Sequence, residues 1–103
     1  MNYTVIVTNP AEDDLFEAME YISQKLKNPP AVGKLLAEFE RAVDKLETVP
    51  KLHKVVDDDF LAEQGFRSMQ IGNYLLFYII NEETQTVAVQ RFLYARRDWP
   101  NII

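Results

Sequence analysis

The amino-acid sequence predicts an α+β fold, in which a hairpin of two helices packs on one face of a mostly antiparallel four-stranded sheet. A short β-branched run near the N-terminus is followed by two stretches whose apolar residues recur every three or four positions, the spacing of an amphipathic helix. From residue 66 onward the pattern changes to a period of two, which is typical of strands. The elements therefore follow the order β-α-α-β-β-β, and a chain of 103 residues suits a single domain, 1–103.

The N-terminal third predicts a strand followed by a helix. Residues 3–8 alternate and are β-branched, which is typical of a strand. Asn9 is expected to cap the helix, Pro10 suits its first position, and the acidic residues 12–14 suit the positive end of the helix dipole. One apolar face continues to about Lys27, where Asn-Pro-Pro at 28–30 breaks the helix.

The middle of the chain predicts a second helix and a loop. From Pro30 to Thr48 one face is apolar and the other carries charges of both signs. Two helices joined by so short a break form an antiparallel hairpin. Pro50 ends the second helix, and residues 51–62 are polar and are expected to be irregular.

The C-terminal part predicts three consecutive strands. Residues 66–71 form the first, and Gly72-Asn73 supplies a turn from residues that tolerate positive φ. Residues 74–80 form the next strand, 81–85 a turn, and 86–94 the last strand. Strands joined by such short turns pair antiparallel.

The composition excludes several classes of protein. There is no cysteine, so disulfides, thiolate metal sites and a cysteine nucleophile are excluded, and three glycines cannot supply a phosphate-cradling loop. The N-terminus lacks the features of a signal peptide, and no apolar run approaches the ~18 residues that span a bilayer. We therefore expect a cytoplasmic protein that needs no cofactor and has no membrane partner.

The charge is acidic overall but unevenly distributed. The net charge is −5 and the pI near 4.8, which argues against nucleic-acid binding over the whole surface. Residues 1–60 hold seven Lys and Arg against twelve Asp and Glu, whereas residues 61–103 hold four against four. Three arginines and one aspartate fall within 91–98. The C-terminal segment is thus the place where cations gather.

Two other polar features predict little chemistry. His53 is the single histidine, lies in the predicted loop and has no second ligand at a metal-binding spacing, so a surface position is expected. The run Asp57-Asp58-Asp59 lacks the glycine and the terminal glutamate of a calcium loop. We interpret it as a solvated acidic loop, and no metal site is predicted.

The candidate functional residues lie at strand ends near the C-terminus. Arginines beside tyrosine and tryptophan suit phosphate clamping and base stacking. An alternative is that Arg97 and Asp98 form a surface pair and that Trp99 anchors the tail to the core. The candidates are Arg67, Arg91, Tyr94, Arg96, Arg97 and Trp99.

Several motifs, in this order and spacing, resemble the toxins of the bacterial RelE/ParE superfamily. They span nearly the whole chain and comprise a tyrosine in the first strand, Asp13-Asp14-Leu15, Leu46 to Pro50, Gly65-Phe66-Arg67, Ile71 to Tyr74, Phe77-Tyr78, and Arg91 to Asp98. The resemblance implies the toxic half of a type II toxin–antitoxin module. It implies a cognate antitoxin as partner, and operator DNA that is contacted only through the antitoxin.

The superfamily divides into two activities. RelE-like members are metal-independent endoribonucleases that cut messenger RNA on the ribosome, by attack of the ribose 2′-OH on the adjacent phosphate. ParE-like members poison DNA gyrase by binding it and need no catalytic residue. The first activity is our leading hypothesis from the sequence, the second is the alternative, and a copy that has lost toxicity but still binds the antitoxin is a third.

Under the endoribonuclease hypothesis the resemblance assigns residue roles. Arg67, Tyr94 and Arg97 would be catalytic, and Arg91, Arg96 and Trp99 would bind substrate. Tyr94 stands where many relatives have a histidine, and a phenol is a poor general base at neutral pH. Met69 and Leu75 replace cations of the best-known nuclease members, and Ile103 falls where such members have a catalytic tyrosine.

Overall fold

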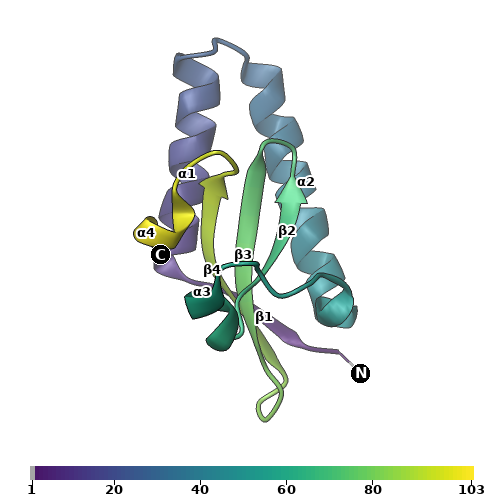
Figure 1. Ribbon diagram of the computed structural model, residues 1–103. Coiled ribbons are helices and arrows are strands. Elements are labelled where there is room, and N and C mark those ends of the chain that lie inside the picture. Colours follow the sequence, from purple (N-terminus) through teal and green to yellow (C-terminus); the bar gives the residue numbers. More distant parts are fainter. Residues whose placement is uncertain (1) are drawn as a thin grey trace.

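The computed structural model describes residues 2–103 and confirms the predicted fold class (Figure 1). The elements are β1 (Thr4–Val7), α1 (Asn9–Gln24), α2 (Pro29–Thr48), the 3-10 turn η1 (Pro50–Leu52), α3 (Asp59–Glu63), β2 (Arg67–Ile71), β3 (Tyr74–Asn81), β4 (Thr86–Tyr94) and α4 (Trp99–Ile102). The sheet order is β1-β4-β3-β2, in which β1 pairs parallel with β4 and the other pairs are antiparallel. The helices α1 and α2 form the predicted hairpin on one face. Among the helices of residues 2–103, none combines the length and apolar character that crossing a bilayer requires.

The ends of α1 differ from the sequence prediction. Thr8, not Asn9, is the N-cap: its backbone is extended and its hydroxyl accepts a hydrogen bond from the Ala11 N–H (3.4 Å). At the other end the helix stops at Gln24, before the predicted Lys27. Lys27 has a φ of 50°, and the Asn28 N–H bonds back to the Ile22 carbonyl, the left-handed ending in which glycine is usual.

The main core lies between the helix hairpin and the sheet. One face each of α1 and α2 packs on alternate residues of β2, β3 and β4, with Leu46, Leu76 and Tyr78 at most 1% exposed. Tyr78 is the largest of the fully buried side chains, and its hydroxyl donates a hydrogen bond to the Pro50 carbonyl (2.6 Å). That bond ties the turn after α2 to the centre of the sheet.

The opposite face of the sheet carries a second core that the sequence did not predict. Residues 51–62 were expected to be irregular, but they include the end of η1 and most of α3, and α4 follows β4. Asp58 of the acidic run caps α3 by accepting from the Leu61 N–H (3.0 Å). Both helices lie on the face of the sheet opposite the hairpin (Figure 1). The buried residues there are Val56, Leu61, Phe66, Phe77 and Leu93.

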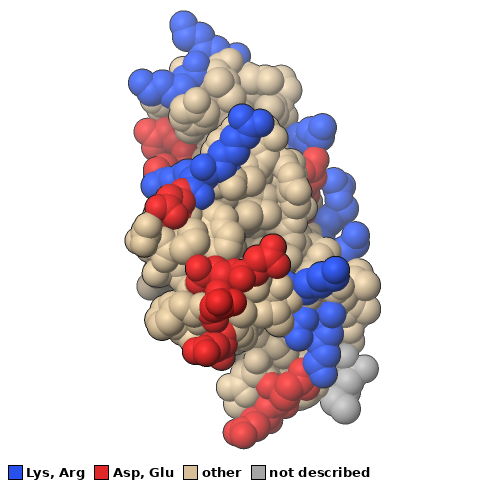
Figure 2. Space-filling view, viewed as in Figure 1, with Lys and Arg blue, Asp and Glu red and all other residues tan. Residues whose placement is uncertain are grey.

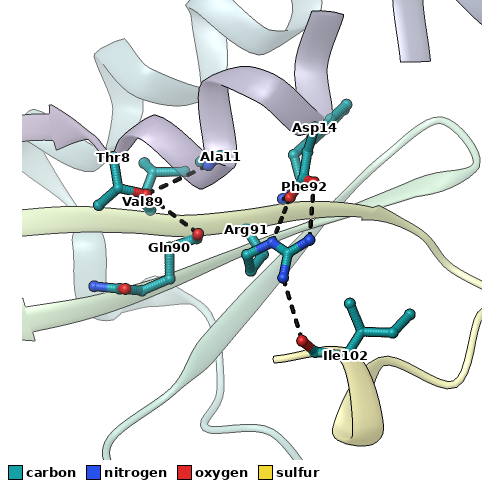
Figure 3. Close-up of polar contacts among 8 residues, drawn as sticks. All are labelled: Thr8, Ala11, Asp14, Val89, Gln90, Arg91, Phe92 and Ile102. Atoms are coloured by element: carbon teal, nitrogen blue, oxygen red, sulfur yellow. Dashed lines mark hydrogen bonds and ion pairs between the residues drawn. The ribbon is translucent and has the colours of Figure 1, made fainter. Parts of the chain in front are cut away.

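The outer edge of β4 is closed by side chains where β1 ends (Figure 3). The register between β3 and β4 slips after the Tyr78–Val89 pair, a β-bulge that leaves Gln90 without a partner residue. The Thr8 hydroxyl lies 2.8 Å from the Val89 carbonyl and 3.2 Å from that of Gln90. The Asp14 carboxylate accepts from the Phe92 N–H (3.0 Å).

The same carboxylate forms a two-bonded ion pair with Arg91. The Arg91 Nε and Nη2 donate to its two oxygens at 2.6 and 2.9 Å, and Nη1 donates to the Ile102 carbonyl (3.3 Å). The side chain of Asp14 is only 9% exposed. The neighbouring carboxylate, led by its hydrogen bonds, raises the pKa of Arg91 above its ordinary value. Arg91 thus connects α1, β4 and α4.

Loss of this ion pair should destabilise the fold. We expect Asp14→Ala to lower the free energy of unfolding by about 2–3 kcal/mol, because it leaves the Arg91 guanidinium and the Phe92 N–H without a partner at a partly buried site. Denaturant unfolding measures the loss. Asp13→Ala, at an exposed neighbour, should cost no more than about 0.5 kcal/mol. Equal losses in the two variants would contradict the structural role of Asp14.

Alkaline pH should weaken the Tyr78 contact. Burial raises the pKa of Tyr78 to about 12, above about 10 in the unfolded chain. Its contribution to stability is therefore complete below about pH 10 and is lost as the pH rises through about 12. Urea unfolding at about pH 8 and pH 11 measures how far the free energy of unfolding falls between the two pH values. This fall should be smaller for Tyr78→Phe than for the unchanged protein. An identical loss in both would refute this role.

Candidate functional site

The structure separates Arg67 from the other predicted catalytic residues. Arg67 lies opposite Tyr78 on β3, whereas Tyr94 lies opposite Tyr74. Arg67 and Tyr94 are therefore offset by four residues along the strands, about 13 Å, and by two strand spacings across the sheet, about 10 Å. The guanidinium donates to the His53 carbonyl (2.7 Å), so Arg67 holds the loop after α2 against β2.

Two of the three predicted substrate-binding residues make folding contacts. Arg91 is in the ion pair with Asp14 described above. Trp99 packs on Phe77 with ring centroids 5.1 Å apart, in the second core with Ile102 and Ile103. This position matches the alternative in which Trp99 anchors the tail to the core. Asp98 bonds to Asn101 (2.6 Å) and forms no ion pair with Arg97.

Tyr94, Arg96 and Arg97 lie together at the exposed end of β4. The Arg97 N–H bonds to the Tyr94 carbonyl (3.0 Å), which closes a tight turn after the strand. Tyr94 is 40% exposed, and both arginines are exposed. Figure 2 shows Lys and Arg side chains over this end of the molecule. These three are the predicted site residues that the structure brings together.

Beside this turn lies a groove between α1 and the end of β4. Its volume is about 750 Å³ and it reaches from Asp14 to the tip of the helix hairpin. We call it the aromatic groove, because four of its lining residues are Tyr21, Tyr74, Phe92 and Tyr94, with Arg97 at its rim. Tyr21 is 52% exposed, so an aromatic ring is available to a partner.

The rings on the sheet side of the aromatic groove hold one another in place. Tyr74 stacks on Phe92 with centroids 5.0 Å apart and planes 14° from parallel, and it meets Tyr94 edge to face at 5.8 Å. Burial, with the neighbouring phenols, raises the pKa of Tyr74 above its ordinary value. A packed set of rings loses little side-chain freedom when a partner binds.

The groove also exposes an open part of the β4 edge. The Phe92 N–H bonds to Asp14, on the side away from β3, and the Ala95 N–H bonds to the Asn73 carbonyl, on the side of β3. The backbone groups of successive β4 residues thus point alternately away from β3 and toward it. The Phe92 carbonyl and the Tyr94 N–H therefore point away from β3. No backbone group within residues 2–103 bonds to them. Apolar rings beside free backbone groups suit the binding of a polypeptide.

The remaining sequence candidates show no site chemistry. His53 is half-buried in the loop after η1, and its carbonyl holds Arg67. Within residues 2–103, no three His, Cys, Asp or Glu side chains lie close enough together to hold a metal ion. Tyr21 was missed because it falls beside the apolar face of α1 rather than on it. A large aromatic residue next to that face was the available signal.

Comparisons with known proteins agree with this fold. The family model described as ParE toxin of the type II toxin–antitoxin system parDE matches residues 5–99. A chain from the crystal structure of the RelBE2 toxin–antitoxin complex of Mycobacterium tuberculosis is 30% identical over 91% of this chain and 99% of its own, with a TM-score of 0.62. A chain from the chromosomal ParDE system of P. aeruginosa shares the fold, with a TM-score of 0.73 at 13% identity over 91% of this chain and 97% of its own.

None of the curated proteins matches this sequence. The family model nevertheless covers almost all of the described chain, from β1 to the first residue of α4. The relative from M. tuberculosis and the ParE model agree on the same superfamily, which the sequence motifs also indicated. The chain therefore belongs to the ParE toxin family of type II toxin–antitoxin systems.

Proposed function

We propose that this toxin acts as ParE-like members do, by binding DNA gyrase, and that it does not depend on a catalytic centre. One observation carries the proposal: Arg67, Arg91 and Trp99, three of the six predicted site residues, are engaged in contacts that hold the fold. The match to the ParE model supports the same conclusion.

The chemistry of RNA cleavage would demand more than the remaining residues supply. Attack of a 2′-OH on phosphorus needs a group that activates the hydroxyl, cations at the phosphate and a proton for the leaving oxygen. Tyr94, Arg96 and Arg97 could supply cations and a phenol, but a phenol is a weak base at neutral pH. Arg67 is too distant to join them. A surface that only binds a partner does not need several catalytic groups placed around one phosphate.

One observation favours the endoribonuclease as second candidate. Arg96 and Arg97 are exposed next to Tyr94, and a cation pair beside an aromatic ring suits a phosphate and its base. In that case the partners would be the ribosome and messenger RNA. Gyrase and the ribosome both act in the cytoplasm, which is the location that we infer for the toxin.

We further propose that the cognate antitoxin occupies the aromatic groove. The related chains of known structure come from a RelBE2 toxin–antitoxin complex and a ParDE toxin–antitoxin system. In this chain the groove joins exposed rings to the open backbone groups of Phe92 and Tyr94. Contact with operator DNA would then come through the antitoxin, since the toxin is acidic overall.

The target can be determined directly. Expression without the antitoxin should arrest growth, leave messenger RNA uncut by primer extension, and inhibit supercoiling by purified gyrase. Site-specific cuts in translated codons that disappear in Arg97→Ala would contradict gyrase as target and favour the endoribonuclease. Normal growth with the folded protein present would favour a copy that has lost toxicity.

The antitoxin site can be tested with two matched residues of α1. Tyr21 and Phe16 are 52% and 53% exposed, but only Tyr21 lines the aromatic groove. We expect Tyr21→Ala to weaken binding of the purified antitoxin about tenfold or more, because aromatic anchors dominate interfaces, and Phe16→Ala to leave it nearly unchanged. Calorimetric titration gives both values. Similar effects in the two variants would contradict this location.

A further inference from the structure

The outer edge of β2, at the other side of the sheet, has backbone groups that no strand covers. Ile71 and Tyr74 flank a two-residue turn, which makes them a hydrogen-bonded pair. The backbone groups of Arg67, Met69 and Ile71 therefore bond to β3. The backbone groups of Ser68 and Gln70, between them, point away from β3. The bond from the Val56 N–H to the Phe66 carbonyl (3.0 Å) agrees with this alternation, and it belongs to an isolated antiparallel bridge between Val55 and Arg67 that covers the start of this edge. Within residues 2–103 the Ser68 carbonyl and both backbone groups of Gln70 have no backbone partner.

A shallow hollow of about 220 Å³ runs along this edge, between β2 and α2. Residues 69–72 line one side of it, and Glu38, Arg41 and Lys45 line the other. Gln70 itself is exposed, and its side chain bonds only to the Gly72 carbonyl (3.0 Å). An added strand would therefore meet open backbone groups on one side and charged side chains on the other.

The charge on this side of α2 is positive on balance, because three cations stand there against Glu38. Lys34, Arg41 and Lys45 recur at the spacing that puts residues on one side of a helix, and all three are exposed. Beyond α2, Lys54 adds a further cation, whereas Lys51 is paired with Glu82 (3.0 Å). Figure 2 shows Lys and Arg side chains along the side where α2 lies. In a chain with a net charge of −5, this row is a local exception.

We propose that the β2 edge and the cations of α2 together bind an extended acidic segment of a partner protein, which adds to the sheet as a fifth strand. Backbone donors and acceptors at strand spacing are complementary to a polypeptide and not to a nucleic acid. Acidic side chains at every second position would face Arg41 and Lys45, and their attraction would orient the segment. This surface lies across the sheet from the aromatic groove, and the inference does not depend on the target proposed above.

A peptide of about ten residues, with glutamate and threonine alternating, is a suitable probe. We expect saturable shifts in the amide resonances of residues 68–71 and slower hydrogen exchange at the Gln70 N–H. Gln70→Pro should abolish binding, because proline removes that N–H while an edge strand tolerates it. Gln70→Thr loses the same side-chain bond but keeps the N–H, and it should bind normally. Unchanged thermal unfolding would show that both variants fold.

The cations are tested by charge reversal. Arg41→Glu with Lys45→Glu should weaken peptide binding about tenfold or more, because attraction to the acidic peptide becomes repulsion. Lys25→Glu with Lys27→Glu makes the same change in net charge at the hairpin tip and should have little effect. No saturable binding up to about 1 mM peptide, or equal binding by Gln70→Pro and Gln70→Thr, would overturn the proposal. Binding of an oligouridylate that Gln70→Pro leaves intact, without binding of the peptide, would assign the surface to RNA.

Discussion

β1 is shorter than β4, and this difference leaves part of a strand edge that the fold must close in another way. Beyond Val89 the outward backbone groups of β4 would lack partners at a partly buried edge, which is costly. The Thr8 hydroxyl, just after β1, donates to the Val89 carbonyl, and the Asp14 carboxylate, in α1, accepts from the Phe92 N–H, so the two side chains supply the missing bonds. Arg91 then extends the contact to α4. One carboxylate therefore links α1, β4 and, through Arg91, the C-terminal segment.

This arrangement engages Arg91, and the second core engages Trp99, two of the predicted site residues. Arg91 is held by two bonds to a nearly buried carboxylate, and Trp99 packs on Phe77 in the second core. The closure stops at Phe92, so the last part of the β4 edge stays open beside the rings of the aromatic groove. Within residues 2–103, the β2 edge is open beyond the Val55–Arg67 bridge, on the other side of the sheet. Open backbone groups are thus accessible on both sides of the described sheet, next to aromatic rings on one side and charged side chains on the other.

The main fold could be predicted from the sequence because its elements have clear periods. The apolar face of α2 and the continuous apolar run of β3 each follow from residues close together in the chain. The second core could not be predicted in this way. Val56 and Leu61 belong to segments too short to show a period, and they become buried with Phe66 only because the sheet face opposite α1 and α2 needs a cover.

The sequence by itself determined the element order, the helix hairpin, the antiparallel strands and the family, because these depend on local spacing and on motif order. It also located the exposed group of Tyr94, Arg96 and Arg97. Only the tertiary structure decided that Arg91 belongs to an ion pair with Asp14, that Arg67 holds a loop, and that Tyr21 lines a groove. Those roles depend on residues up to 77 positions apart in the chain, and no local pattern records which of them meet.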